Sequence, residues 1–284
     1  MANIASVVRR KVANWTVTAV RKDGSFASKP DVLVTEEPLE IRVESPSQTV
    51  QPVAVTMRTP GHDFELAVGF LFTEGMIKNL DDVHTVRYCQ LPDSAEQQFN
   101  VVTVSLTVQF DEALSRRGMV TSASCGICGT TSIEQLAQSV SRIESGVGPV
   151  MTSQMLVALP EIIREMQPTF DRTGGLHAAG LVDAQGVAFC VREDVGRHNA
   201  VDKVIGKAVL ENKIPISSHA LVVSGRLSFE IIQKAAMAGI SFIAAVGAPS
   251  SLAVETAEDL GITLVGFVRD GTANIYTHKH RIAN

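Results

Sequence analysis

Two cysteines separated by two residues are the feature of this sequence best suited to covalent chemistry. Cys125 and Cys128 lie in the stretch 122–129, which reads SASCGICG and consists mostly of small residues. A pair with this spacing has three chemical interpretations: half of a structural zinc site, a dithiol redox couple, or a sulfur-transfer nucleophile with a neighbouring thiol. A fourth interpretation is structural, since two small apolar side chains can simply pack in a turn.

The residues around the pair favour sulfur transfer. A four-cysteine zinc site needs a second close pair, whereas Cys89 and Cys190 are isolated from each other, although a zinc site completed by histidines stays open. A thioredoxin-type couple sits at a helix N-terminus, but glycines flank both cysteines here, and the capping-box spacing of Thr131 and Glu134 predicts that the helix begins later. A cysteine that receives sulfur from one protein and presents it elsewhere needs a mobile, exposed loop, which a glycine-rich sequence favours.

Bulk composition limits the class of protein. The chain has 284 residues with 45% hydrophobic content, enough to bury a substantial core. Its formal net charge of −5 argues against a nucleic-acid partner. The cysteines do not form a framework of close pairs, and no apolar run of signal-peptide or membrane-spanning length follows the basic residues 9–11. We therefore expect a cytoplasmic protein without a disulfide scaffold and without a membrane partner.

The elements that must position the cysteine loop are predicted from hydrophobic periodicity. Before the loop, strands are expected at 39–44, 52–57, 83–89 and 100–108, and helical spacing from Leu66 predicts a helix that ends near Gly75. From about Ser153 onward, apolar strands alternate with amphipathic helices. The strands are expected at 187–191, 220–224, 242–246 and 263–268, and the helices at 199–210, 228–237 and 251–260.

The fold class that follows is α/β. The runs 220–223 and 242–246 are apolar throughout, which is typical of strands buried on both faces of a largely parallel sheet covered by helices. We predict three parts: an N-terminal extension with a strand (1–35), an α+β lobe that carries the cysteine loop at its end (36–140), and an α/β lobe (141–284).

Eight short strings occur in one order along the chain. They are EEPL at 36–39, MRTPGHD at 57–63, GFLFTEG at 69–75, SCGICG at 124–129, TGGLHAA at 173–179, REDVGRHN at 192–199, SGR at 224–226 and APSS at 248–251. Together they resemble the FdhD/NarQ family, the formate dehydrogenase accessory sulfurtransferases. The resemblance covers most of the chain from Glu36 onward and is far more specific than an isolated cysteine pair.

The resemblance implies a function and its partners. Members of this family take sulfur from a cysteine desulfurase and pass it to the molybdenum cofactor, bis-molybdopterin guanine dinucleotide, before that cofactor enters formate dehydrogenase. By resemblance, Cys125 carries the persulfide and Cys128 supports it, either by relaying sulfur or by limiting over-oxidation. The resemblance also implies a cytidine deaminase-like fold for 141–284, transient binding of the cofactor as a substrate, no permanent metal, and self-association as a homodimer.

A cofactor pocket is expected in the α/β lobe, where three loops follow successive strands. Ligands of open α/β sheets collect beyond the carboxyl ends of the strands. A guanine dinucleotide needs phosphate donors and a group that reads the base, and arginine and serine supply such chemistry. The predicted binding residues are Ser224, Gly225, Arg226, Ser250 and Ser251 and, by family resemblance, Phe267, Val268, Arg269, Asp270, Gly271 and Thr272. The structural alternative is that these are ordinary turns, with Ser251 a helix cap and Arg226 solvated.

His177 and the charged segment 192–198 each have two interpretations. His177 is either a core histidine or a pocket residue, because Gly174 and Gly175 would let a ligand approach the backbone. We include it among the predicted binding residues. The charged side chains of 192–198 form either a structural ion-pair network or part of the site, and the sequence does not separate the two.

Two other classes of function compete with sulfur transfer. A chaperone that binds the molybdenum cofactor for formate dehydrogenase without chemistry of its own would need the pocket but not the thiol of Cys125. A zinc-dependent nucleoside deaminase is disfavoured, because its His-x-Glu motif requires a glutamate where Ala179 stands. The cysteine pair of such enzymes also follows a proline and lies downstream of the histidine, whereas here it lies upstream of His177.

Overall fold

The computed structural model describes residues 10–89, 99–111 and 142–284. Cys125, Cys128 and the helix expected after Thr131 lie outside these ranges, and what the sequence predicts for them stays a prediction. None of the helices within the described ranges is long and apolar enough to cross a membrane.

Most of the elements expected from periodicity are present. The N-terminal part contains β1 (Val12–Val20), β2 (Phe26–Val34), β3 (Glu37–Glu44), β4 (Gln51–Arg58), α1 (Asp63–Thr73), the short helix η1 (Leu80–Asp82), β5 (Val83–Tyr88) and β6 (Val101–Leu106). The C-terminal part contains β7 (Met151–Thr152), α4 (Ser153–Arg164), α5 (Pro168–Thr173), β8 (His177–Asp183), β9 (Ala188–Asp194), α6 (Arg197–Leu210), β10 (His219–Val223), α7 (Phe229–Met237), β11 (Phe242–Ala245), α8 (Ser251–Leu260), β12 (Thr263–Arg269), β13 (Thr272–Ile275), η2 (Lys279–Arg281) and β14 (Ile282–Ala283).

A six-stranded sheet with the order β13-β12-β11-β10-β8-β9 forms the centre of the C-terminal part. β10, β11 and β12 are parallel, whereas the remaining pairings are antiparallel. Short turns join β8 to β9 and β12 to β13, and a hairpin connection requires antiparallel pairing. The α/β class is therefore confirmed, and the parallel arrangement holds for the three central strands while the flanking strands make the sheet mixed.

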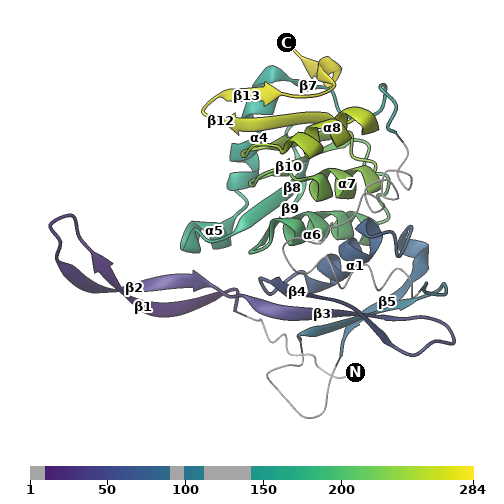
Figure 1. Ribbon diagram of the computed structural model, residues 1–284, viewed down its shortest axis with the longest axis horizontal. Coiled ribbons are helices and arrows are strands. Elements are labelled where there is room, and N and C mark those ends of the chain that lie inside the picture. Colours follow the sequence, from purple (N-terminus) through teal and green to yellow (C-terminus); the bar gives the residue numbers. More distant parts are fainter. Residues whose placement is uncertain (1–9, 90–98, 112–141) are drawn as a thin grey trace.

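Helices cover both faces of this sheet (Figure 1). Successive side chains of β10 point to opposite faces. Ala220 and Val222 pack in the core beneath α4, and Leu221 and Val223 pack in the core that α6, α7 and α8 cover. All four side chains are buried, which confirms that this apolar run is enclosed on both faces.

A four-stranded sheet with the order β4-β3-β6-β5 forms the other end of the body, next to α1 (Figure 1). Along β3, Leu39, Ile41 and Val43 are buried while the residues between them are half-buried. This is the two-residue alternation expected of a strand with one face on the core. The same hydrophobic core continues from these residues through α1 into α6 and the central sheet.

α1 and α6 cross in direct backbone contact, which joins the two ends of the body. A Cβ on Gly69 would stand 1.8 Å from the carbonyl oxygen of Asp202, and a Cβ on Gly206 would stand 1.8 Å from the carbonyl oxygen of Glu65. Only glycine permits such an approach, because any side chain would overlap the facing backbone. The helices therefore pack more closely than side chains would allow.

Two of the sequence motifs, at 57–63 and 192–199, are hydrogen-bonded to each other beside the crossing of α1 and α6. Lys203 Nζ lies 2.6 Å from Asp194 Oδ2 and donates to the carbonyl oxygen of Thr59 at 3.0 Å. Thr59 N also donates to Asp194 Oδ2, at 3.2 Å. Asn199 Nδ2 donates to the carbonyl oxygen of Met57 at 2.8 Å. Buried charges are tolerated only when they are paired and hydrogen-bonded, so these contacts hold the two strings together.

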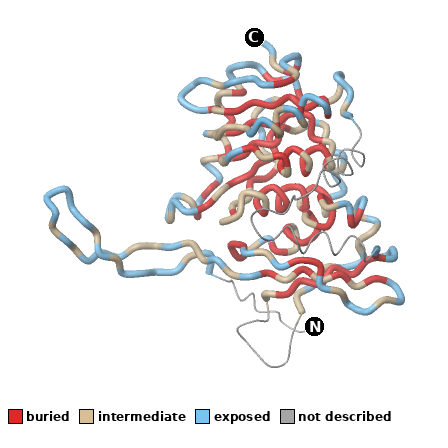
Figure 2. The backbone as a smooth tube through the Cα atoms, viewed as in Figure 1, coloured by how far each residue is buried: buried red, intermediate tan, exposed pale blue. Residues whose placement is uncertain are grey.

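An antiparallel hairpin of β1 and β2 projects from the body as a long arm (Figure 1). Nine residue pairs hold it, from Val12↔Val34 at the base to Val20↔Phe26 at the tip. No residue of the arm between these ends is fully buried (Figure 2).

Candidate functional site

The loops after β10 and β11 lie in contact at the carboxyl edge of the central sheet, and the second of them also contacts Phe267 near the end of β12. Gly247 N donates to the carbonyl oxygen of Gly225 at 3.3 Å, and Phe267 N donates to the carbonyl oxygen of Gly247 at 3.1 Å. A Cβ on Gly247 would stand 2.7 Å from the Gly225 oxygen, so glycine is required for this approach. The structure thus brings two of the three predicted loops together with the end of β12, at the edge where neighbouring parallel strands end.

His177, the first residue of β8, lies against the first of these loops. A Cβ on Gly225 would stand 3.3 Å from His177 Nδ1 and 3.7 Å from Arg197 Cδ. Burial lowers the pKa of His177, and Arg197 and Arg226 lower it further against the opposite effect of Asp194. His177 is therefore a neutral histidine in positively charged surroundings.

The guanidinium of Arg197 has a buried nitrogen without a partner. Arg197 Nε makes no hydrogen bond within the described residues. A buried donor left unpaired costs about 1–3 kcal/mol, and arginine is well suited to phosphate and carboxylate oxygens. Arg226 is exposed in the adjacent loop and has no hydrogen bond or ion pair with the part of the chain that the structure describes. The two arginines and His177 together form a set of groups that can bind an anion.

Two helices begin at this edge without a side-chain cap. The N-cap residue of α6 is Gly196 and that of α7 is Ser228, and neither side chain bonds to the first turn. The first N–H groups of a helix have no partner within the helix and carry partial positive charge. The start of α6 therefore adds to the anion-binding character of the edge, whereas the first turn of α7 carries the carboxylate of Glu230.

Two of the three predicted serines, Ser224 and Ser250, occupy structural positions. Ser224 Oγ accepts a hydrogen bond from Ala178 N at 2.9 Å. Ser250 Oγ accepts from Ala253 N at 3.2 Å and so caps α8. The helix cap expected at Ser251 thus lies one residue earlier, and Ser251 is the first residue of α8 and is exposed. The hydroxyls of Ser224 and Ser250 hold the loops in place.

Segment 267–272 combines an irregular strand end with a tight turn. Phe267 and Asp270 have φ values of 52° and 53°, in the left-handed region that non-glycine residues rarely adopt. Arg269 pairs with Thr272 across the turn. Asp270 and Gly271, with φ of 70° at Gly271, form the two-residue loop, and left-handed backbone at both positions is typical of such hairpins.

Only part of this segment presents accessible side chains. Val268 is fully buried in the core beneath α4. Arg269 is exposed, and its guanidinium carbon lies 5.4 Å from the centre of the Phe267 ring. An aromatic ring and an arginine at this distance form a suitable surface for a planar base. Asp270 and Thr272 are exposed as well, so Val268 is the residue of this segment whose side chain is withdrawn from a ligand.

The charged segment 192–198 divides between the core and the edge. Arg192 Nη2 donates to Glu65 Oε1 at 2.8 Å. Glu193 accepts from the backbone N–H groups at the start of α5, and Asp194 belongs to the buried pair described above. Arg197, by contrast, lies beside the loops. The ion-pair interpretation therefore applies to Arg192 and Asp194, whereas Arg197, which is not among the predicted binding residues, is a candidate for the site.

His198 connects the starts of α6 and α7. Its Nε2 lies 3.2 Å from Ser228 Oγ and 4.0 Å from a carboxylate oxygen of Glu230. Burial, with Arg197 and Lys234, lowers the pKa of His198 to about 4 against the opposite effect of Glu230. The ring is therefore neutral at physiological pH, and it acts as a hydrogen-bonding link rather than as a cation.

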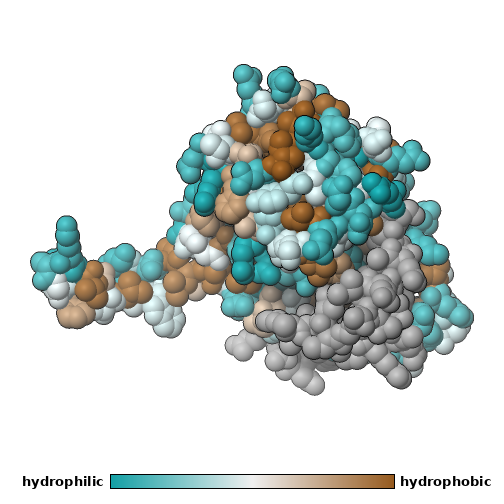
Figure 3. All heavy atoms as spheres, turned by 45° about the horizontal axis from the view of Figure 1, so that its top comes forward, coloured by the Kyte–Doolittle hydropathy of each residue, from teal (hydrophilic) through white to brown (hydrophobic). Residues whose placement is uncertain are grey.

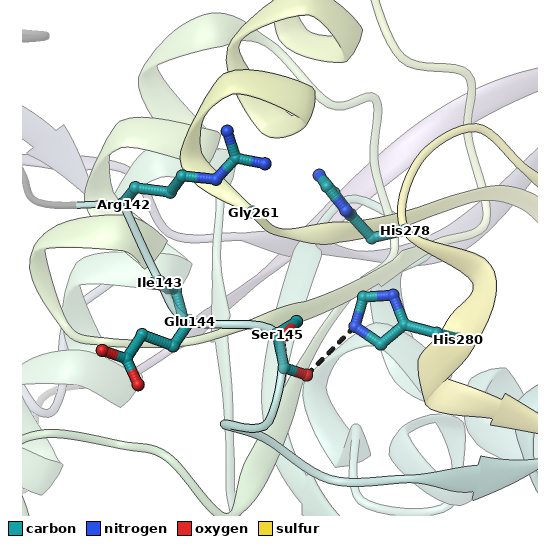
Figure 4. Close-up of a pocket in the computed structure, with 7 residues that line it drawn as sticks. All are labelled: Arg142, Ile143, Glu144, Ser145, Gly261, His278 and His280. Atoms are coloured by element: carbon teal, nitrogen blue, oxygen red, sulfur yellow. Dashed lines mark hydrogen bonds between the residues drawn. The ribbon is translucent and has the colours of Figure 1, made fainter.

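A separate cavity lies at the opposite, amino edge of the central strands. It has a volume of about 470 Å³ and is lined by residues 142–145, Gly261, His278 and His280 (Figure 4). His280 Nε2 lies 3.1 Å from the carbonyl oxygen of Ser145. Gly261 precedes β12, whereas the predicted loops follow their strands. None of the predicted binding residues lines this cavity.

Of the two cysteines within the described ranges, Cys190 differs clearly from a reactive thiol. Cys190 is buried in β9, and burial raises its pKa to about 12, so the thiolate needed for nucleophilic chemistry is scarce at neutral pH. Cys89 is half-buried at the end of β5. Residues 10–89, 99–111 and 142–284 contain no group of three metal-binding side chains; since Cys125 and Cys128 lie outside these ranges, the expected absence of a permanent metal stays a prediction.

Comparison with known proteins places the chain in a family. The model of the FdhD/NarQ family matches residues 34–283. The sulfur carrier protein FdhD of Mycolicibacterium paratuberculosis is 48% identical over 278 residues, covering 96% of this chain and 98% of the relative. The protein of that name from Streptomyces avermitilis is 45% identical over 266 residues, covering 92% of this chain and 93% of the relative.

A solved structure agrees with the fold. A crystal structure from Desulfotalea psychrophila, described as a formate dehydrogenase accessory protein, superimposes with a TM-score of 0.74 at 22% identity and covers 96% of this chain and 100% of that one. The fold, the family model and the relatives agree over nearly the whole length. This chain therefore belongs to the FdhD/NarQ family.

Proposed function

We propose that this chain is a sulfur carrier of the cytoplasm that accepts persulfide sulfur from a cysteine desulfurase on Cys125. It then transfers the sulfur to bis-molybdopterin guanine dinucleotide before that cofactor is inserted into formate dehydrogenase. The observation that carries the proposal is 48% identity, over 96% of the chain, to a protein named sulfur carrier protein FdhD. Among the four cysteines, the burial and raised pKa of Cys190 make that thiol unsuitable.

The loading step is an exchange between a thiolate and a persulfide. The Cys125 thiolate attacks the outer sulfur of the desulfurase persulfide, a new S–S bond forms on Cys125, and the bond to the desulfurase sulfur breaks as its thiolate leaves. One S–S bond replaces another, so the step needs neither an oxidant nor a reductant.

The carboxyl edge of the central sheet supports the substrate half of the proposal. The cofactor carries phosphate groups and guanine bases, and both need defined partners. We assign the phosphates to Arg197, Arg226 and the start of α6, since these supply positive charge and N–H groups without a side-chain cap. Phe267 and Arg269 are assigned to a guanine base, because their side chains lie close together and are accessible.

A mass measurement tests the loading step. The full chain is incubated with a cysteine desulfurase and cysteine, and peptides are analysed with and without reductant. We expect the peptide that contains Cys125 to gain the mass of one sulfur, which reduction removes. Cys125→Ala should abolish the gain, whereas Cys128→Ala and the matched control Cys190→Ala should retain it. Absence of the gain on Cys125 would refute the proposal.

Activity in cells separates a carrier from a chaperone without chemistry. Under the proposal, Cys125→Ala leaves formate dehydrogenase inactive although the variant is present at normal abundance. A chaperone that only binds the cofactor would support normal formate dehydrogenase activity with this variant.

A nucleotide titration tests the substrate half. Guanosine diphosphate should bind the wild-type chain and bind Arg197→Ala at least about tenfold more weakly, a loss of ~1.4 kcal/mol. Arg142→Ala is the matched control, because Arg142 lines the cavity at the opposite edge. Weaker binding by Arg142→Ala alone would move the nucleotide site to that cavity.

A further inference from the structure

The cavity at the amino edge of the central strands has the size and rigidity of a ligand site. Its volume of about 470 Å³ lies within the range of about 300–1,000 Å³ that is usual for pockets that bind small molecules. Ile143 N donates to the carbonyl oxygen of Leu260 at 2.9 Å. A Cβ on Gly261, where φ is 74°, would stand 2.3 Å from the carbonyl oxygen of Ile143. Segment 142–145 is therefore held tightly against the end of α8, and the wall of the cavity is a fixed part of the fold.

A buried cation without a counter-charge lies beside this cavity. Arg281 is 1% exposed, and its guanidinium donates to the carbonyl oxygens of Glu144 at 3.2 Å and Gly261 at 3.0 Å, two residues that line the cavity. Its other hydrogen bonds also go to uncharged oxygens, and it forms no ion pair within the described residues. Burial lowers the pKa of Arg281, and no carboxylate of the described residues opposes this effect. Because buried charges are normally paired, an anion in the adjacent cavity would supply the missing partner.

The side chains on the wall of the cavity are mainly polar. Arg142 is exposed, extends toward the side on which His278 lies, and has no hydrogen bond or ion pair with the part of the chain that the structure describes (Figure 4). The carboxylate of Glu144 is turned away from both histidines in the same view. Figure 3 shows apolar side chains along the arm of β1 and β2, whereas arginine, glutamate, serine and histidine line most of this cavity. The cavity therefore suits a charged ligand rather than an apolar one.

The two imidazole rings of the cavity are each fixed through one nitrogen. His278 Nε2 lies 2.9 Å from the carbonyl oxygen of Glu258, and His280 Nε2 lies 3.1 Å from that of Ser145. A carbonyl oxygen only accepts, so Nε2 carries the hydrogen in both rings and Nδ1 is left for a ligand. The ring centres are 5.9 Å apart, with their planes at 80°. Nδ1 accepts in the neutral ring and donates in the imidazolium ion, so protonation of the rings decides what they bind.

The last carbonyl oxygens of α8 already have donors. They accept hydrogen bonds from the backbone N–H groups of Ile143, Gly261 and Ile262. A metal ion needs several ligands with free lone pairs, whereas the unpaired guanidinium of Arg142 favours an anion. The charged side chains around the rings come from three elements. They are Glu258 of α8, Arg142 and Glu144 of the segment before β7, and Lys279 and Arg281 of η2.

We propose that this cavity binds a small inorganic oxyanion of the sulfate or phosphate type. Arg142 and the Nδ1 atoms of His278 and His280 donate to its oxygens, and the charge of Arg281 lies behind them. Nδ1 donates only when both ring nitrogens carry hydrogen, so the anion is taken up together with a proton. The site is independent of the sulfur transfer, because none of the predicted binding residues lines the cavity.

Nuclear magnetic resonance of the histidine rings in the full chain tests the proposal, with sulfate as the probe at constant ionic strength. Sulfate keeps its charge around neutral pH, so a pH dependence belongs to the protein. The signals of His278 and His280, identified from the variants His278→Gln and His280→Gln, should shift as sulfate is added, whereas that of the exposed His84 should not. Because histidines change charge between about pH 5 and 8, sulfate should bind at least about threefold more tightly at about pH 6 than at about pH 8.

Matched variants separate this cavity from general surface charge. Arg142→Ala should bind sulfate at least about tenfold more weakly. Lys279→Ala removes an exposed charge from the same part of the chain without altering the lining, and it should bind nearly as tightly as the wild type. Arg197→Ala should also respond normally, so a failure of the nucleotide site would be distinguishable. Absence of a shift in the wild type, equal weakening in Arg142→Ala and Lys279→Ala, or a response of the rings to Zn²⁺ or guanosine diphosphate but not to sulfate would overturn the proposal.

Discussion

His177 and Gly225 lie close together at the candidate site, with Nδ1 of the imidazole 3.3 Å from where a Cβ on Gly225 would stand. This distance is shorter than ordinary van der Waals contact, so a side chain at residue 225 would require the ring or the loop to move by a few tenths of an ångström. The same loop leads directly into Arg226. The position of the cationic groups therefore depends on a glycine that has no chemistry of its own.

Replacing Gly225 by Ala should weaken nucleotide binding more than it weakens the fold. The added methyl group must displace the His177 ring or the loop, which shifts Arg226 away from its position. We expect guanosine diphosphate to bind about tenfold more weakly, a loss of ~1.4 kcal/mol, in a calorimetric titration. Gly146→Ala is the control, since a Cβ there meets no atom within 4 Å. Equal binding by both variants would show that the loop does not contact the ligand.

Replacing Lys203 by Met should strongly destabilise the protein. The change leaves the fully buried carboxylate of Asp194 without its cation, and breaking a buried pair in this way costs about 3–5 kcal/mol. Urea unfolding measures the loss. Lys207→Met, on the same helix, removes a largely exposed pair with Glu211 and should cost about 0–1 kcal/mol. Similar losses in both variants would mean that the pair with Asp194 is not a principal support of the fold.

His198 should make the protein less stable as the pH falls from about 6.5, the ordinary pKa of histidine. The unfolded chain binds a proton on His198 near that pH, whereas burial, with Arg197 and Lys234, holds the folded pKa at about 4. The contribution of His198 to the free energy of unfolding is therefore complete above pH ~6.5. It declines as the pH falls toward the pKa of about 4 in the folded protein.

Unfolding in urea across this pH range, for wild type and His198→Gln, isolates the effect. The variant should lose less stability on acidification than the wild type. His84→Gln, at an exposed histidine of β5, should behave like the wild type. If His198→Gln and wild type lose stability in parallel, the folded ring is protonated as readily as the unfolded one.

Cys190 should resist alkylation while the protein is folded. Its thiol is buried, and the pKa raised to about 12 leaves little thiolate for reaction. We expect iodoacetamide to modify Cys190 only after unfolding in urea, whereas the half-buried Cys89 reacts sooner. Peptide mass spectrometry over a time course measures both rates. Equal rates in the native protein would contradict the assignment of Cys190 to the core.

The regular elements were predictable because burial imposes a period on the sequence. The apolar run of β10 indicates a strand enclosed on both faces, and the alternation of Leu39, Ile41 and Val43 indicates one with a single buried face. The contact between the loops after β10 and β11, and of the second with the end of β12, follows from parallel pairing. The helix α4 and strand β8 were not assigned, and the antiparallel flanks of the sheet depend on hairpin turns that periodicity does not reveal.

The composition of the candidate site was only partly predictable. Arg192 and Arg197 belong to one string, yet Arg192 pairs with Glu65 while Arg197 keeps an unpaired nitrogen at the edge. The two arginines are only five positions apart, but Arg192 lies in β9 and Arg197 begins α6. Which neighbours surround each side chain is decided by tertiary packing, which the sequence pattern does not reveal. Val268, predicted to bind the cofactor, has a buried side chain because it lies on the α4 face of the sheet.

The glycine crossing of α1 and α6 has a consequence for how the chain can be divided. Gly69 and Gly206 lie more than a hundred positions apart in the sequence, yet a Cβ on Gly206 would stand 2.7 Å from the backbone nitrogen of Gly69. A fragment of the chain that ends between these two glycines would contain only one of the two helices. It would expose the surface of that helix at the crossing and the part of the hydrophobic core that the other helix covers. Neither half is thus an autonomous folding unit, and separately expressed fragments should recover structure only when they are combined.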